Sequence, residues 1–321
     1  MDRRNFLKTT AVLAALGAVS KITGSLQAAA PAKKKTASGA PDIVVIRNGE
    51  PAEMFETLIK ELGGMQKFVK PGQSVVIKPN IAWNQPPEMA ANTHPELVAA
   101  VIRHCKAAGA SKIYVFDTTC NFWKDTYQSS GIAEAAEKAG AIVVGGDSEK
   151  DPEYLKEYYS EVTIPNAKVL KKMMHHNLIR QCDVFINIPV LKVHGGAKLT
   201  CCMKNLMGTV SKGYQKYFHK HGLNQCIAEC CSFRKPDLNI VDAYRVMTKR
   251  GPRGVDQSDV KLLRYQMGGT DMVALDTAGA KMLNVPLRRI GHIAIARSIG
   301  LGTTDLNSLN IKRINLNPGK K

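Results

Sequence analysis

The sequence predicts an α/β fold with a mostly parallel sheet and helices on both faces. Three observations predict it. Short runs rich in β-branched residues alternate with amphipathic runs of helical spacing. The run at 183–190 is apolar almost throughout, as in a strand that is buried on both faces. Polar residues follow several of these runs where each run ends.

The expected elements follow in chain order. Strands are expected at 42–47, 74–78, 112–116, 141–144, 183–190, 239–242 and 272–275. Helices are expected at 52–62, 95–108, 132–139, 277–283 and 289–297. The charged stretch 147–172 is expected to be an insertion or a small subdomain, and 249–259 a polar loop.

The chain begins with the pattern of a twin-arginine export signal. Arg3 and Arg4 precede Phe6, Leu7 and Lys8, and a short apolar run with small residues follows. We therefore expect a signal peptide at 1–32, a linker at 33–41, a single α/β domain at 42–314 and a basic tail at 315–321. The protein is expected to be periplasmic or otherwise exported, with the twin-arginine export machinery as a partner.

The charge of the chain favours anionic partners. The formal net charge is +18, whereas aromatic residues make up only 6% of the chain. No nucleic-acid reader motif is present, so sequence-specific nucleic-acid binding is not expected. Neither the P-loop spacing nor Gly-x-Gly-x-x-Gly occurs, which excludes a standard nucleotide fingerprint. A small anionic ligand fits this composition.

Polar and basic residues cluster where the expected strands end. In open α/β sheets, ligands bind outside the carboxyl ends of the strands. We expect Lys78, Lys192, His194 and Lys204 to supply positive charge there, and Asn80 and Asn205 to supply amide hydrogen bonds. Asp117 ends a neighbouring strand and joins this set. The combination suits a carboxylate or a phosphate, and the alternative is that each residue caps a strand and faces water.

Eight cysteines occur, and five of them lie between 201 and 231. Cys226 and Cys230 are four residues apart, so they share one helix face, which we expect to be turned towards the core. Three states remain open: an iron–sulfur cluster or other metal bound by Cys201, Cys202, Cys226 and Cys230; disulfides; or buried free thiols. The ferredoxin spacing is absent, and the pair His175–His176 is expected to be exposed.

Three motifs suggest a family. They are Lys78-Pro79-Asn80, then Asn187-x-Pro189-x-Leu191-Lys192-x-His194, then Thr200-x-x-x-Lys204-Asn205-x-x-Gly208. Together they resemble the domain of unknown function 362 family over about residues 43–296. The resemblance implies the α/β fold and the place of the site. Members of that family are sometimes joined to iron–sulfur ferredoxin modules, and this chain contains none.

Two classes of function remain open for an exported α/β protein with a basic anion-binding cleft. The first is a redox or iron–sulfur-associated enzyme that uses the cysteine segment beside the basic site. The second is a non-catalytic periplasmic binding or accessory protein for an anionic ligand or a partner protein. The distances among the cysteine sulfurs separate the two, because ligands of one metal must converge.

Overall fold

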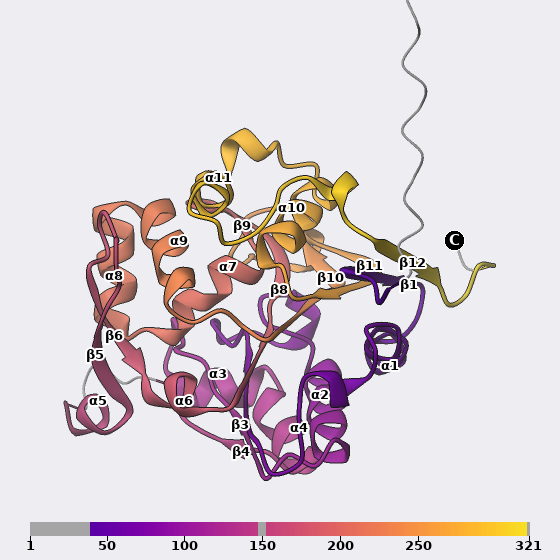
Figure 1. Ribbon diagram of the computed structural model, residues 1–321, viewed down its shortest axis with the longest axis horizontal. Helices are drawn as coiled ribbons and strands as arrows, with labels where there is room; N and C mark the ends of the chain where they lie inside the picture. The colour runs from indigo at the N-terminus through magenta and orange to yellow at the C-terminus, as the bar shows by residue number, and fades with distance from the viewer. Residues whose placement is uncertain (1–38, 147–151, 320–321) are drawn as a thin grey trace, which may run out of the picture. The chain divides into compact units, whose positions relative to one another are not determined.

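A mixed sheet of ten strands forms the centre of the protein, whose computed structural model describes residues 39–146 and 152–319 (Figure 1). The strands are β1 (Ile43–Arg47), β2 (Ser74–Pro79), β3 (Lys112–Val115), β4 (Ile142–Val143), β7 (Val184–Ile188), β8 (Val190–His194), β9 (Lys198–Thr200), β10 (Leu238–Met247), β11 (Val260–Gly269) and β12 (Ile311–Asn315). Their order is β12-β1-β11-β10-β7-β2-β3-β4, while β8 pairs with β10 and β9. The expected signal peptide and linker residues 33–38 lie outside the described residues.

Most strand pairs are parallel, as predicted. Strands β10, β7, β2, β3 and β4 form a continuous parallel set. Strand β11 pairs antiparallel with both β1 and β10, and β9 pairs antiparallel with β8. In the parallel set all carboxyl ends lie at one edge of the sheet, which is where the candidate site forms.

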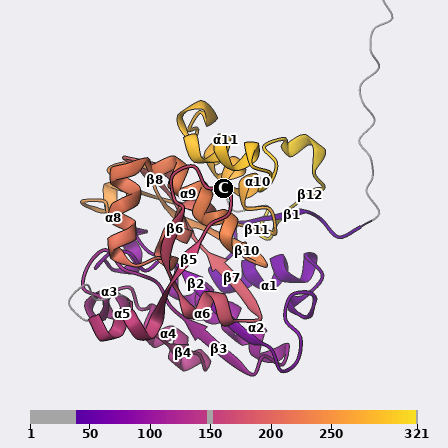
Figure 2. The ribbon, with the colours of Figure 1, turned by 60° about the vertical axis from the view of Figure 1, so that its left-hand side comes forward.

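Helices cover both faces of the sheet, and the central strands send alternate side chains into two separate cores (Figures 1 and 2). In β2, Val75 and Ile77 enter one core, whereas Val76 enters the other. The first face carries α1 (Pro51–Glu61), α2 (Pro95–Ala107), α3 (Trp123–Ser129) and α4 (Ile132–Ala139). The second carries α7 (Cys202–Asn205), α8 (Lys212–His221), α9 (Leu223–Phe233), α10 (Met272–Met282) and α11 (Gly291–Ser298).

The charged stretch after β4 contains a small sheet of its own. Helix α5 (Pro152–Tyr158) leads into β5 (Tyr159–Thr163), which pairs antiparallel with β6 (Lys172–His176) before α6 (Asn177–Gln181). The expectation that His175 and His176 are exposed was wrong, because both side chains are buried. The ring of His176 stacks on Phe116 with 3.9 Å between the ring centroids, so the pair belongs to the core.

The expected strand at 272–275 was also wrong, since these residues form the first turn of α10. Asp271 decides the outcome. Its carboxylate accepts hydrogen bonds from the backbone N–H groups of Val273 and Ala274, each at 2.9 Å, which caps a helix start.

Among the described residues, no helix has the length and apolar character that crossing a membrane requires.

Candidate functional site

The strand ends that the sequence singled out lie side by side. In the register of the sheet, Lys78 of β2 is opposite Asn187 of β7, and Ile77 is opposite Val115 of β3. Asp117 follows β3 by two residues. Strand β8 begins one residue after β7 and carries Lys192 and His194 along the same edge. Three segments that are far apart in sequence, around residues 78, 117 and 187–194, therefore meet at one edge of the sheet.

A cavity of about 210 Å³ opens at this edge. Most of the residues predicted for the site line it: Asn80, Asp117, Lys192, His194, Lys204 and Asn205. Lys78 does not line the cavity and lies fully buried, paired with one of the lining residues. The structure thus brings six of the seven predicted residues to the wall of one cavity and places Lys78 behind that wall.

A buried ion pair forms part of the wall. The Nζ of Lys78 is 2.7 Å from Oδ1 of Asp117, and the other carboxylate oxygen accepts the N–H of Ile81 at 2.7 Å. Burial lowers the pKa of Lys78 and raises that of Asp117, and the attraction between the two partly offsets both shifts. Gly208 packs against the pair: a Cβ there would lie 1.8 Å from Oδ1 of Asp117. Lys78 therefore gives no free charge to the cavity, which corrects its expected role.

A chain of asparagine amides links the strands under the cavity. The Nδ2 of Asn80 donates to Oδ1 of Asn205 at 2.9 Å, and Nδ2 of Asn205 donates to Oδ1 of Asn187 at 2.8 Å. The Nδ2 of Asn187 then donates to Oδ1 of Asn239 at 2.9 Å. Because these side chains satisfy one another, the two asparagines that line the cavity are held in fixed orientations.

Two lysines supply the charge of the cavity. Lys192 is buried and donates to the carbonyl oxygen of Ala91 and, at 3.4 Å, to Oδ1 of Asn80. Lys204 is half-buried, and neither lysine forms an ion pair with any described residue. Burial lowers the pKa of Lys192 to about 7 and that of Lys204 to about 8. Binding of an anion in the cavity would therefore favour the protonated, charged form of both amines.

His194 contributes a neutral hydrogen-bond donor in place of the expected positive charge. Burial and the nearby Lys204 lower the pKa of His194 to about 3. Its Nδ1 accepts the backbone N–H groups of Gly196 and Ala197, each at 3.1 Å. In a neutral ring the proton must then be on Nε2, so this nitrogen is a donor.

Helix α7 sets the position of Lys204 and Asn205. It has only four residues, so it depends on outside contacts for its start. Asp276 of α10 supplies them: its carboxylate accepts the N–H of Cys202 at 2.7 Å and that of Met203 at 3.3 Å. The helix is thereby held across the strand ends with its second half turned to the cavity.

Several lining residues were not foreseen from the sequence. They include Cys120, Thr200, Gln215 and His219. Gln215 and His219 are four residues apart on α8, so a shared polar helix face was the available signal. Thr200 begins the third family motif, which was the available signal for it, and its hydroxyl oxygen is buried without a hydrogen-bond partner among the described residues.

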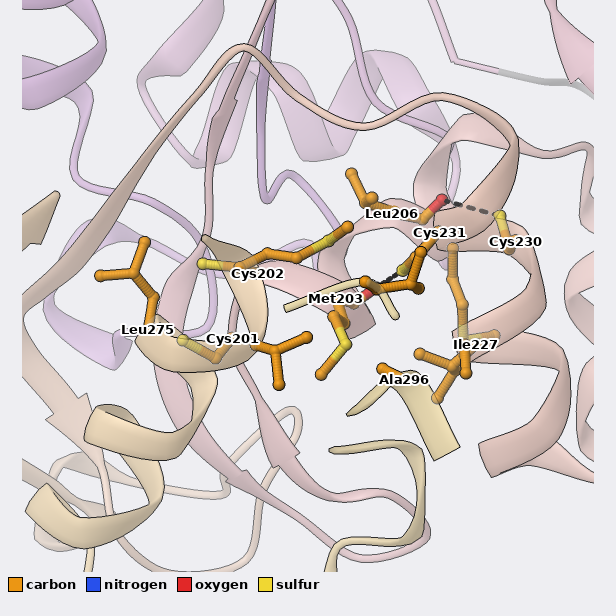
Figure 3. Packing of buried hydrophobic residues seen from close by; sticks show 14 of the residues in the cluster. Cys201, Cys202, Met203, Leu206, Ile227, Cys230, Cys231, Leu275 and Ala296 are labelled. Atoms are coloured by element: carbon orange, nitrogen blue, oxygen red, sulfur yellow. Dashed lines mark hydrogen bonds between the residues drawn. The ribbon is translucent and has the colours of Figure 1, made fainter. Parts of the chain in front are cut away.

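The cysteines separate into different places. All eight are free thiols, and Cys226 and Cys230 are buried in the core, as expected of their helix face. Figure 3 shows the sulfurs of Cys201 and Cys202 on one side of the packed cluster and Cys230 on the other. In the described part of the chain, the only triad of metal-ligating atoms that lie close together comes from Cys201, Cys202 and Asp276. The four-cysteine set is not brought together.

Comparisons with known proteins identify an export signal and a relative of the chain. A twin-arginine translocation pathway signal sequence matches residues 1–20, so the protein is exported by that route. The chain is 27% identical over 259 residues to the thylakoid-associated protein sll1697 of Synechocystis sp., covering 78% of this chain and 75% of that protein.

Two solved structures are also similar. The lactate racemase apoprotein of Thermoanaerobacterium thermosaccharolyticum has a TM-score of 0.46 and 15% identity over 75% of this chain. A protein of Thermotoga maritima has a TM-score of 0.44 and 10% identity over 78% of this chain. The matched parts are 57% and 60% of those two chains. The family named domain of unknown function (DUF362) matches residues 75–281, and this chain therefore belongs to the DUF362 family.

Proposed function

We propose that this exported protein binds a small carboxylate or phosphate anion in the cavity at the carboxyl ends of the strands. The observation that carries the proposal is the pair of lysines, Lys192 and Lys204, which line one cavity with no carboxylate partner among the described residues. The one acidic residue of the wall, Asp117, is already paired with Lys78. The cavity therefore has a surplus of positive charge that an anion would neutralise.

Uncharged donors complete the proposed site. The amide of Asn80, the Nε2–H of His194 and the unpartnered hydroxyl of Thr200 all belong to lining residues. The amide of Asn205 already donates to Oδ1 of Asn187 and to the carbonyl oxygen of Lys78, so it holds the wall of the cavity in place. Oxygen atoms of carboxylate and phosphate accept several such bonds at once. A volume of about 210 Å³ suits a small anion and not an extended polymer.

Isothermal titration calorimetry of the full chain with inorganic phosphate, citrate and acetate tests the proposal. Lys204→Ala is the informative variant, because Lys204 is half-buried and has no ion pair to lose among the described residues. One charge-assisted hydrogen bond is worth about 1.5–3 kcal/mol, so the affinity for the best anion should fall roughly 10- to 100-fold.

Lys198→Ala is the matched control, since Lys198 is on the adjacent strand β9 and donates to the carbonyl of Gly195 outside the cavity lining. It should bind the anion as the wild type does. If none of the three anions binds, or if both variants lose affinity equally, the cavity does not bind these anions through Lys204.

Proton-transfer chemistry on the bound anion is a second candidate. It is favoured by the pKa of about 7 for Lys192, since a general base works best when its pKa is near the working pH. Proton NMR of carboxylates incubated with the protein in D₂O measures such a step as loss of a C–H signal. Exchange by the wild type that Lys192→Met abolishes would support it, and no exchange with any carboxylate that binds would refute it.

A further inference from the structure

A second cluster of reactive side chains lies around the start of helix α7, and its residues are not among those that line the cavity. One ligand atom each from Cys201, Cys202 and Asp276 lies within 4.8 Å of the other two, and all three residues are buried. Ligands around one tetrahedral zinc ion, at about 2.0–2.3 Å from the metal, are roughly 3.5 Å apart. Movements of about 1 Å would bring these three atoms to that spacing.

The imidazole of His292 supplies an independent observation. His292 is completely buried on α11, and its Nε2 is 3.8 Å from Oδ2 of Asp276. Burial disfavours the charged form of an imidazole, so the neutral ring is the form favoured here. This Nε2 has no hydrogen-bond partner among the described residues.

The tautomer of His292 follows from its other nitrogen. Oδ1 of Asn224 lies 3.1 Å from Nδ1 and also accepts the backbone N–H of His292 at 3.2 Å. That atom is therefore an acceptor, and Nδ1 must carry the ring proton. The lone pair of Nε2 consequently faces a carboxylate oxygen, which is itself an acceptor. Two acceptors that face each other in a dry interior require a proton or a cation between them.

The arrangement around these atoms matches that of a metal centre. A metal-bound histidine usually donates its second ring N–H to an oxygen acceptor, as Nδ1 does to Asn224. The carboxylate of Asp276 is held by the N–H groups of Cys202 and Met203, and no lysine or arginine of the described chain pairs with it. The outer contacts are thus in place, and the thiols of Cys201 and Cys202 also hydrogen-bond to the carboxylate. A bound metal would take the place of those thiol protons.

We propose that Cys201, Cys202, Asp276 and His292 bind one transition-metal ion of the zinc class. Two thiolates, one imidazole and one carboxylate form a donor set that suits Zn²⁺ and Co²⁺. The four ligands would come from three elements: the start of α7, α10 and α11. The Nε2 of His292 is not within 4.8 Å of all three other ligand atoms, so it would have to approach the sulfurs on binding. Because Cys202 and Lys204 share α7, the metal also fixes the segment that carries one lysine of the anion cavity.

Cobalt provides the direct test. The full chain is purified without air, treated with a chelator, and titrated with Co²⁺ and separately with Zn²⁺, and metal content is measured by mass spectrometry. We expect about one metal per chain and an absorption band from thiolate-to-cobalt charge transfer. Cys201→Ser/Cys202→Ser should lose the band, and His292→Ala should weaken binding at least tenfold. Cys226→Ser/Cys230→Ser is the matched control, with two equally buried thiols, and should keep metal and band.

A measurement on the wild type guards against misfolded variants. Zn²⁺ should slow alkylation of Cys201 and Cys202 under native conditions and leave the rates of Cys226 and Cys230 unchanged. Absence of bound metal and of the thiolate band would overturn the proposal. So would a Cys201–Cys202 disulfide in the anaerobically purified protein, or loss of metal in the Cys226/Cys230 variant alone. None of these results depends on whether an anion binds in the cavity.

Discussion

The buried pair of Lys78 and Asp117 offers the sharpest test of how the site is built. Lys78→Met keeps the apolar stem of the side chain and removes the charge. Both partners are at most 3% exposed, so the carboxylate of Asp117 would be left buried with the N–H of Ile81. Breaking a buried pair on one side costs about 3–5 kcal/mol. For a domain of this size the unfolding midpoint should fall by roughly 6–15 °C.

The stability that Lys78→Met loses relative to the wild type should depend on pH in one direction. Without Lys78, burial of Asp117 is opposed only by the N–H of Ile81 and the charge of Lys192, so the pKa of Asp117 rises further above the unfolded value. A group with a raised folded pKa contributes stability that is present at low pH and is lost as the pH rises through that pKa. The deficit of Lys78→Met relative to the wild type should therefore shrink as the pH is lowered from about 8 to about 5.

Urea unfolding followed by circular dichroism measures both effects. Lys172→Met is the control, because Lys172 pairs with Glu161 at the surface, where both side chains are more than half exposed, and its stability should match the wild type. The double variant Lys78→Met/Asp117→Asn should lose less unfolding free energy than the two single variants lose together, because no buried charge remains in it. A Lys78→Met loss no larger than that of Lys172→Met, or strict additivity, would refute this account.

Four further outcomes are expected. Gly208→Ala should destabilise the fold by about 1–3 kcal/mol in urea unfolding, because its Cβ would lie 1.8 Å from Oδ1 of Asp117. Glu229→Ala should cost about 2 kcal/mol by the same measurement, since its carboxylate accepts backbone N–H groups from the segment 168–170. Replacing Arg3 and Arg4 by Lys should leave the protein in the cytoplasm on cell fractionation. Sulfate affinity, measured by calorimetry, should fall as the pH rises through about 7 to 8, because the two cavity lysines lose their protons there.

The parallel sheet and the edge at which the site lies could be predicted because both depend on local patterns. The apolar run at 183–190 and the polar residues that follow each strand mark the strand ends directly. The run at 272–275 was misassigned because four apolar residues fit a strand or a helix equally well. The side-chain cap from Asp271 decides between the two, and its hydrogen bonds form only in the folded helix.

The chemistry of the site was harder to predict because it depends on contacts between distant segments. Nothing near Lys78 in sequence indicates that Asp117 neutralises it, and nothing near His194 indicates a neutral ring. The surroundings of the cysteines were hidden for the same reason. Asp276 follows Cys202 by 74 residues and is still the group that Cys202 contacts. The spacing between cysteines alone could not indicate this contact.

The chain of asparagine amides has a direction. Each Nδ2 donates to the next Oδ1, from Asn80 through Asn205 and Asn187 to Asn239, whose own Nδ2 donates to the carbonyl of Thr270 at 3.4 Å. All the amide dipoles are thus arranged head to tail, and the free acceptor end, Oδ1 of Asn80, meets the amine of Lys192. A single amide cannot turn around without breaking the bonds on both sides of it. The charge on one lysine is thereby coupled to the orientation of side chains on four separate segments of the protein.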